Sequence, residues 1–225
     1  MALPKLGVPQ YELSMPSTGK TVKYRPFLVK EEKQVIDAVK NVLKSCVISR
    51  IKVDQLPSFD LEYLFLKIRA AAIGEVIEMT VTCTDDGSTS ATATINIDDV
   101  EVIKEEGHDR KIMLTDTTGI LMKYPSMDRF IESQFLNKGV DAEHIFSFIA
   151  EHIEQIFDEE EVYDSSTTSK KEFREFVESL TSKQFESIQK FYETMPRLSH
   201  TFTVVNPNTG NECEYTIEGL QSFFA

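Results

Sequence analysis

The stretch LEYLFLKIRAAAIGEVIEMTVTCTDDGSTSATATINI, residues 61–97, joins a helical pattern directly to a strand pattern. Leu61–Ile73 carries apolar side chains at helical spacing on more than one face, which is typical of a buried helix. Two runs rich in β-branched residues follow, Val76–Cys83 and Ser90–Ile97, and the turn sequence Asp85-Asp86-Gly87 between them predicts a β-hairpin. A helix followed by an antiparallel hairpin indicates an α+β fold.

The same succession of whole hairpins and whole helices continues along the 225-residue chain. Because strands never alternate singly with helices, the pattern excludes a doubly wound parallel sheet. We predict an α+β protein with several antiparallel β-hairpins packed with amphipathic helices, and a helical C-terminal half closed by a final hairpin. Further hairpins are predicted within Tyr11–Phe27, Lys111–Tyr124 and Thr201–Ile217, and further helices within Val35–Cys46, Met127–Phe135, Asp141–Phe157, Ser169–Leu180 and Thr181–Met195.

Local signals mark the starts of helices more clearly than the boundary between domains. Ser169 with Glu172, and Thr181 with Gln184, are capping boxes, each of which pairs two amides at a helix start. We expect residues 1–136 to form a mixed body of hairpins and helices, and residues 137–225 a mainly helical region with a C-terminal hairpin. One continuous domain is the alternative.

The composition narrows the classes of function. With 41% hydrophobic residues the chain can bury a core, and its net charge of −13 disfavours a surface for nucleic acid, although 24 basic residues leave room for a local patch. No stretch approaches the length of a membrane span, and the N-terminus lacks the apolar core of a signal peptide. We therefore expect a soluble protein made in the cytoplasm. Its scattered cysteines, Cys46, Cys83 and Cys213, are expected to be buried apolar side chains.

The sequence PSTGKT, residues 16–21, resembles the end of a phosphate-binding P-loop. A P-loop also needs a glycine five residues before Gly19 and a helix after the motif, but position 14 is Ser14 and a strand-like run follows. The dipeptide Thr-Gly occurs three times with a tyrosine five residues after the glycine. We interpret these as hairpin turns in which glycine supplies a positive φ and the tyrosine shares a strand face with the residue two before it; chance similarity is the alternative. The three pairs are Gly19 with Tyr24, Gly119 with Tyr124, and Gly210 with Tyr215.

The sequence gives only weak indications of a metal site. The nearest histidines, His144 and His152, are two helical turns apart and too distant to bind one ion. The sequence Cys83-Thr-Asp-Asp-Gly87 resembles half of a zinc knuckle with Asp86 in place of the second thiolate, but the chain has no second knuckle. The acidic run Asp158–Glu161, expected to end a helix, lacks the spacing of a calcium loop and suits a solvated face or a docking surface for a basic partner. With no catalytic signature either, the sequence predicts no enzyme, no metal and no cofactor.

Several short motifs together resemble a phage family. These are YELSMPSTGKTVKYRPFLVKEEK (residues 11–33), which contains Arg25-Pro26-Phe27-Leu28, and LFLKIRAAAIGE (residues 64–75), followed by a hairpin and Lys123-Tyr124-Pro125. The chain is similar to the baseplate hub protein family of T-even-type contractile-tail phages. The resemblance covers residues 5–135 well and the remainder by length and order. Some relatives carry two cysteines in the hairpin where this chain has Cys83 alone, which weakens any expectation of a zinc site.

The resemblance implies a non-enzymatic role in assembling the central hub of the baseplate, through contacts with other hub or tail proteins. The alternative is an assembly chaperone that is absent from the finished virion. The expected locations are the host cytoplasm during assembly and the tail baseplate of the virion, without nucleic acid, membrane span or cofactor. Candidate residues for contact surfaces or struts are Arg25, Phe27, Lys67, Arg69 and Tyr124. In the alternative, Phe27 and Tyr124 belong to the core and the charged side chains pair with nearby carboxylates.

Overall fold

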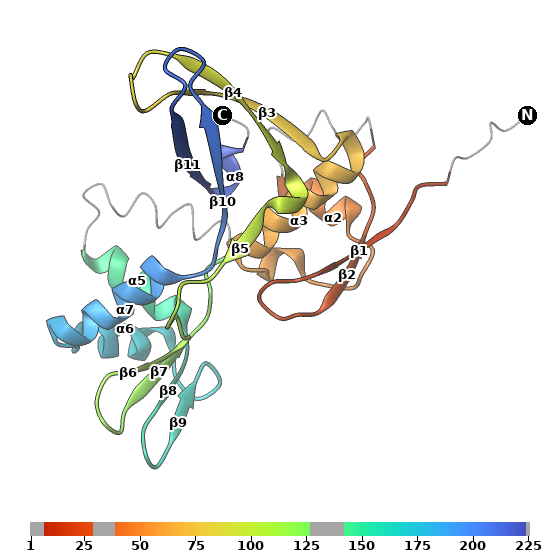
Figure 1. Cartoon of the computed structure of the whole chain (residues 1–225). Coiled ribbons are helices and arrows are strands. Elements are labelled where there is room, and N and C mark those ends of the chain that lie inside the picture. Colours follow the sequence, from red (N-terminus) through yellow and green to blue (C-terminus); the bar gives the residue numbers. More distant parts are fainter. Residues whose placement is uncertain (1–6, 29–38, 127–141, 224–225) are drawn as a thin grey trace, which may run out of the picture. The chain divides into compact units, whose positions relative to one another are not determined.

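The computed structural model describes residues 7–28, 39–126 and 142–223 and forms two compact units (Figure 1). The first unit contains both ends of the chain, Met1–Ile103 and Arg197–Ala225, and the second contains Lys104–Pro196. Both consist of helices with small antiparallel sheets, which confirms the α+β class. The expected boundary between residues 136 and 137 lies outside the described residues, as does the predicted helix Met127–Phe135.

The first unit begins with the predicted hairpin, β1 (Tyr11–Ser14) paired antiparallel with β2 (Thr21–Tyr24). Gly19 closes the turn with a φ of 66°, a conformation that side chains other than glycine rarely adopt. The segment PSTGKT is therefore a hairpin turn and has no helix after it to cradle a phosphate.

Two helices and a short 3-10 turn follow this hairpin: α2 (Val39–Cys46), η1 (Val53–Gln55) and α3 (Ser58–Ile73). The apolar side chains of α3 form the centre of the unit, as the sequence predicted. Gly74, with a φ of 127°, ends the helix. The part of the predicted helix that precedes Val39 lies outside the described residues. Fully buried side chains of α3 are Leu61, Leu64, Leu66 and Ile68.

Two hairpins complete the first unit and lie side by side in Figure 1. The first pairs β3 (Val76–Thr82) with β4 (Ser90–Asn96), and the second pairs β10 (Arg197–Val205) with β11 (Glu212–Glu218). Both were predicted. The short strand β5 (Glu101–Ile103), which was not predicted, follows η2 (Ile97–Asp99) and pairs with the start of β10. The final helix is α8 (Gly219–Ser222).

In the part that the structure describes, the second unit packs three helices with a four-stranded antiparallel sheet of order β6-β7-β8-β9. Its core contains Ile120, Met122, Ile153, Phe173 and Ile188, which come from the sheet and from the helices. The strands are β6 (Lys111–Met113), β7 (Gly119–Met122), β8 (Ile153–Phe157) and β9 (Val162–Asp164), and the helices are α5 (Ala142–His152), α6 (Lys170–Glu178) and α7 (Ser182–Thr194).

The predicted helix Asp141–Phe157 is wrong in its last five residues. Helix α5 ends at His152, and residues 153–157 form β8, which pairs with β7 on one side and β9 on the other. Ile153 and Ile156 suit a helix face as well as a strand, so pairing with distant residues decides the outcome. The acidic run Asp158–Glu161 consequently forms the β8–β9 turn and does not end a helix.

The three Thr-Gly pairs are not equivalent. Gly19 and Gly210 have positive φ as predicted, but Gly119 does not, and it lies within β7. Glycine is needed there because a Cβ atom would lie 2.4 Å from Cζ of Phe157. The predicted shared face is confirmed for Val22 with Tyr24 and for Cys213 with Tyr215, which occupy the more buried face of β2 and of β11. Tyr124 lies beyond the end of β7.

Both predicted capping boxes are present, at Ser169 with Glu172 and at Thr181 with Gln184. Across the parts of the chain that the structure describes, no helix combines the length and hydrophobicity required to span a membrane.

Candidate functional site

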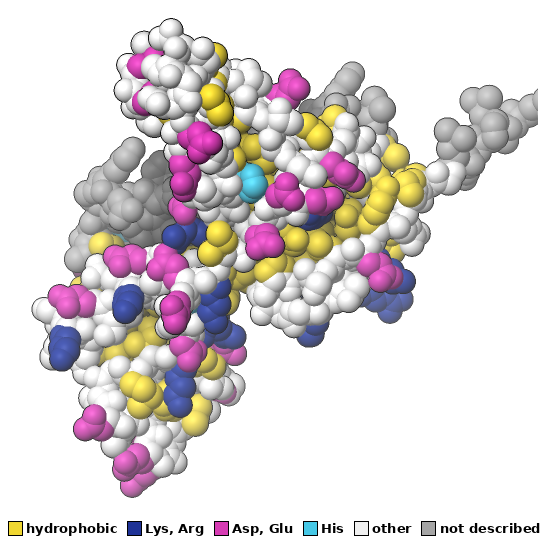
Figure 2. All heavy atoms as spheres, in the orientation of Figure 1, with side chains coloured by type: hydrophobic (Ala, Val, Ile, Leu, Met, Phe, Trp, Pro, Cys, Tyr) yellow, Lys and Arg dark blue, Asp and Glu magenta, His cyan; other side chains and the backbone are white. Residues whose placement is uncertain are grey.

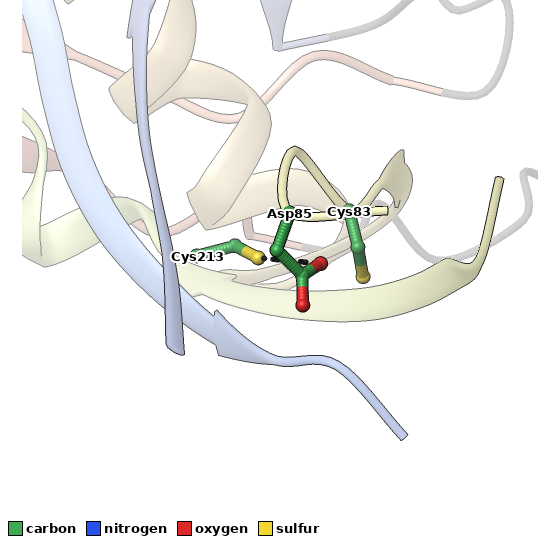
Figure 3. Close-up of side chains that lie close together, drawn as sticks. All are labelled: Cys83, Asp85 and Cys213. Atoms are coloured by element: carbon green, nitrogen blue, oxygen red, sulfur yellow. Dashed lines mark hydrogen bonds between the residues drawn. The ribbon is translucent and has the colours of Figure 1, made fainter. Parts of the chain in front are cut away.

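Two cysteines and an aspartate from separate hairpins meet in the first unit. Cys83 and Asp85 belong to the turn between β3 and β4, and Cys213 to β11. One ligand atom of each lies within 4.8 Å of the other two, and the Cys213 thiol donates to Oδ1 of Asp85 at 3.4 Å (Figure 3). We call Cys83, Asp85 and Cys213 the hairpin corner.

The β3–β4 turn fixes one side of the corner through its own hydrogen bonds. The amide of Cys83 donates to the carbonyl of Thr89 at 2.7 Å, and that of Gly87 to the carbonyl of Cys83 at 2.9 Å. The Asp86 carboxylate accepts from the amides of Ser88 and Thr89 at 3.0 and 2.9 Å. Asp86 thus stabilises its own turn, while the neighbouring Asp85 is available to the second hairpin.

The β10–β11 turn supplies most of the hydrogen-bond partners of Asp85. Asn206, which is fully buried, donates its side-chain amide to Oδ1 at 2.7 Å. The hydroxyl of Thr209 and the side-chain amide of Asn211 donate to Oδ2, the latter at 3.2 Å. Gly210, with a φ of 78°, allows the tight turn that brings these donors together. The carboxylate therefore joins the tips of the two hairpins.

The hairpin corner carries negative charge. Hydrogen bonds from Thr209 and Asn206 lower the pKa of Asp85 to about 2, so this carboxylate is ionised at neutral pH. Burial raises the pKa of the Cys83 thiol, and the adjacent Cys213 and Asp85 raise it further. Among the residues of the two hairpins, the only basic side chains and histidines are Arg197 and His200, at the end of β10 away from the turn.

The corner differs from the half-knuckle considered from the sequence. That hypothesis paired Cys83 with Asp86 and found no second contributor, whereas the structure brings Cys213 and Asp85 to Cys83. The pattern did hold a signal, since Cys213 was predicted to share a strand face with Tyr215, two residues later in the third Thr-Gly hairpin. What the sequence lacked was the packing of one hairpin against the other.

Comparison with known proteins identifies the family. The model of the T4 bacteriophage base plate protein family matches residues 8–225, which span both units. The chain belongs to this family. It is therefore a phage baseplate protein, and its partners are other baseplate proteins. No curated protein and no solved structure matches the chain.

In this baseplate protein, the candidate residues of the first unit are fixed largely by contacts within the chain. The Arg25 guanidinium donates to the carbonyls of Pro26 and Ser45, both at 2.9 Å, and thereby supports the C-terminal end of α2. Lys67 donates to the Asp98 carboxylate at 2.7 Å and to the Ile97 carbonyl at 3.2 Å. Phe27 is buried, with 9% of its surface exposed.

The two other candidates of the baseplate protein are half-buried. Arg69 lies on α3, where burial lowers the pKa of its guanidinium. Tyr124, in the second unit, accepts or donates a hydrogen bond at 3.0 Å with Nε2 of His108 and stacks with Phe191. Four of the candidates thus belong to the first unit and Tyr124 to the second, and the hairpin corner includes none of them.

Proposed function

We propose that this protein takes part in assembling the central hub of the phage baseplate through protein–protein contacts. The observation that carries this proposal is the family match over residues 8–225. The more specific assignment to the hub is supported by the resemblance of the segments around Arg25-Pro26-Phe27-Leu28 and Lys67-Ile68-Arg69 to hub proteins. The proposed activity is binding and not catalysis.

A surface suited to such contacts lies where α3 leads into β3. Ile73 and Val76, three positions apart on either side of Gly74, are 58% and 56% exposed, although both are large and apolar. Figure 2 shows hydrophobic side chains gathered over the first unit near α3 and the β1–β2 hairpin. Single exposed apolar residues are common, but neighbouring ones favour a contact site. We refer to Ile73 and Val76 as the α3–β3 shoulder.

The candidate residues suit the role of struts behind such a surface. Lys67 lies on the same helix as Ile73 and ties it to η2 through Asp98 and the Ile97 carbonyl. Arg25 ties the end of β2 to α2 in the same way. In this proposal Arg25, Lys67 and Arg69 position the elements that carry the contact surface. Phe27 and Tyr124 stabilise the cores of their units.

The proposal is tested by capture from phage-infected cells. The tagged full-length protein is expected to retain other hub proteins, and a phage lacking the gene is expected to yield defective tails. Wild-type tails from that phage, together with capture of no hub protein, would refute the proposed role.

The α3–β3 shoulder is tested separately with matched variants. Ile73→Asp and Val76→Asp are expected to reduce capture of hub proteins at least about tenfold, because they place a charge in an apolar contact. Val162→Asp is the control, since Val162 is also 56% exposed but lies in the second unit. If only the control variant fails to capture hub proteins, the α3–β3 shoulder is not the contact surface, but the proposed role in the hub is unaffected.

Mass spectrometry of purified virions distinguishes a component from a chaperone. Stoichiometric presence of the protein supports a hub component. Its absence, combined with capture of hub proteins during infection, supports an assembly chaperone, a role that the net charge of −13 would suit if the client surface is basic.

A further inference from the structure

The hairpin corner offers ligands of the kind that zinc prefers. Thiolate sulfur and carboxylate oxygen bind Zn²⁺ at about 2.3 Å and about 2.1 Å, which in a tetrahedral arrangement separates ligand atoms by roughly 3.5–3.8 Å. The Sγ of Cys213 is already 3.4 Å from Oδ1 of Asp85, and all three ligand atoms lie within 4.8 Å of one another. Small side-chain adjustments would bring them to coordination distances.

We propose that Cys83, Cys213 and Asp85 bind one Zn²⁺ ion, which joins the tips of the β3–β4 and β10–β11 hairpins. Binding releases the thiol protons to solvent and leaves the two sulfurs as thiolates. The ion takes three ligands from the chain, and a water molecule is expected to supply the fourth. This inference is independent of the proposed role in the hub.

The surroundings of Asp85 support this assignment. Carboxylates that bind zinc are oriented by hydrogen bonds from a second layer of residues. Here the hydroxyl of Thr209 and the side-chain amide of Asn211 donate to Oδ2, while Oδ1 accepts from Asn206 at 2.7 Å and from the Cys213 thiol at 3.4 Å. The carboxylate is therefore fixed in place with one oxygen directed at the thiols.

Charge and burial favour a cation at the corner. Cys83 and Cys213 are buried, with 0% and 2% of their surfaces exposed, and lie beside the carboxyl group of Asp85. The β3–β4 hairpin contains no lysine, arginine or histidine, and in the β10–β11 hairpin these residue types occur only as Arg197 and His200, at the end away from the turn. Metal binding would convert the two buried thiols to thiolates, and the bound ion would neutralise their charge.

A disulfide between the same cysteines is the principal competing outcome. Both thiols are reduced in the structure. A disulfide would join the same hairpins but would leave Asp85 with no role beyond its hydrogen bonds to the β10–β11 turn. The two outcomes are separated by mass, because oxidation removes two hydrogens whereas metal binding adds a metal ion.

The test uses the full-length protein, purified with reductant and stripped of metal. Titration with Co²⁺ is expected to give a thiolate-to-cobalt absorption band that saturates at one ion per chain, and Zn²⁺ is expected to abolish it and raise the melting temperature. Absence of the band, or a native mass that shows a disulfide under reducing conditions, would overturn the proposal.

Variants locate the site. Cys83→Ser and Cys213→Ser are expected to lose the absorption band. Asp85→Asn is expected to weaken zinc binding. Thr209→Val is expected to weaken it by roughly 10- to 100-fold, as is typical when a ligand loses a residue that orients it by a hydrogen bond. Cys46→Ala is the control, since Cys46 is buried in α2 and lies outside the corner. Circular dichroism without metal checks that each variant folds. The wild-type titration tests the proposal even if a variant fails to fold. A cobalt band that persists in folded Cys213→Ser would refute the assigned ligands.

Discussion

At the scale of single residues, Glu62 shows how burial couples stability to pH. This α3 carboxyl is 8% exposed and accepts a hydrogen bond from the amide of Leu220 at 3.2 Å. Burial raises its pKa from 4.5 to about 7. Between those pH values the unfolded chain releases the proton and the folded chain keeps it, so stability falls as pH rises through this window and then levels off.

Glu62→Gln is therefore expected to stabilise the first unit at pH 8 by about 1–3 kcal/mol and to change little at pH 5. The Gln carbonyl can still accept the Leu220 amide without the cost of a buried charge. Urea unfolding at both pH values measures the difference. Glu78→Gln, a change at an exposed position of β3, is the control. An equal effect of Glu62→Gln at both pH values would contradict the explanation.

Gly119 makes a different kind of residue-scale prediction. An added Cβ would lie 2.4 Å from Cζ of Phe157 and 2.9 Å from the carbonyl oxygen of Ile112. Gly119→Ala is expected to destabilise the second unit by about 1–3 kcal/mol through overpacking, as measured by chemical denaturation. In Gly119→Ala/Phe157→Leu the smaller side chain should recover part of this loss, whereas strictly additive effects would show that the contact is not the cause.

At the scale of elements, the sequence predicted the helix ends and turns that depend on residues close together in the chain. The capping boxes at Ser169 and Thr181, the end of α3 at Gly74 and the β3–β4 turn all depend on residues a few positions apart. The β8 strand was missed because Ile153 and Ile156 fit either element, and only pairing with β7 distinguishes them. The hairpin corner was missed for the same reason: Cys213 reaches Cys83 only when two hairpins pack, and spacing along the chain contains no such information.

The Ser169 capping box permits a test of one local cause. Its hydroxyl accepts from the Glu172 amide at 3.3 Å, and its own amide donates to the Glu172 carboxylate at 2.7 Å. Ser169→Ala is expected to cost about 1 kcal/mol of the stability of the second unit, because an amide of α6 loses its acceptor. Thermal unfolding measures the loss. Ser169→Thr retains the hydroxyl and should lose less than half as much; an equal loss would implicate something other than the cap.

At the scale of the whole molecule, the chain forms two units, and the first is built from two segments that the second separates in the sequence. The sequence alone does not reveal this division. The final hairpin belongs to the first unit because β10 pairs with β5 and its turn binds Asp85, although the second unit separates them along the chain. The core of the second unit, in contrast, is composed only of residues between Lys104 and Pro196. A baseplate protein built in this way has two bodies that can each present a surface to neighbouring subunits.

Separate cores predict separate unfolding. Ile188 is fully buried in the core of the second unit, and Ile188→Ala is expected to destabilise that unit by about 2–5 kcal/mol, because it removes buried methyl groups and leaves a cavity. Hydrogen exchange followed by mass spectrometry should then show faster exchange in α5, α6 and α7 while α3 keeps its protection. Leu64→Ala, in the centre of α3, is the reciprocal variant and should give the opposite pattern. Faster exchange throughout the chain in both variants would instead show that the two units unfold as one cooperative body.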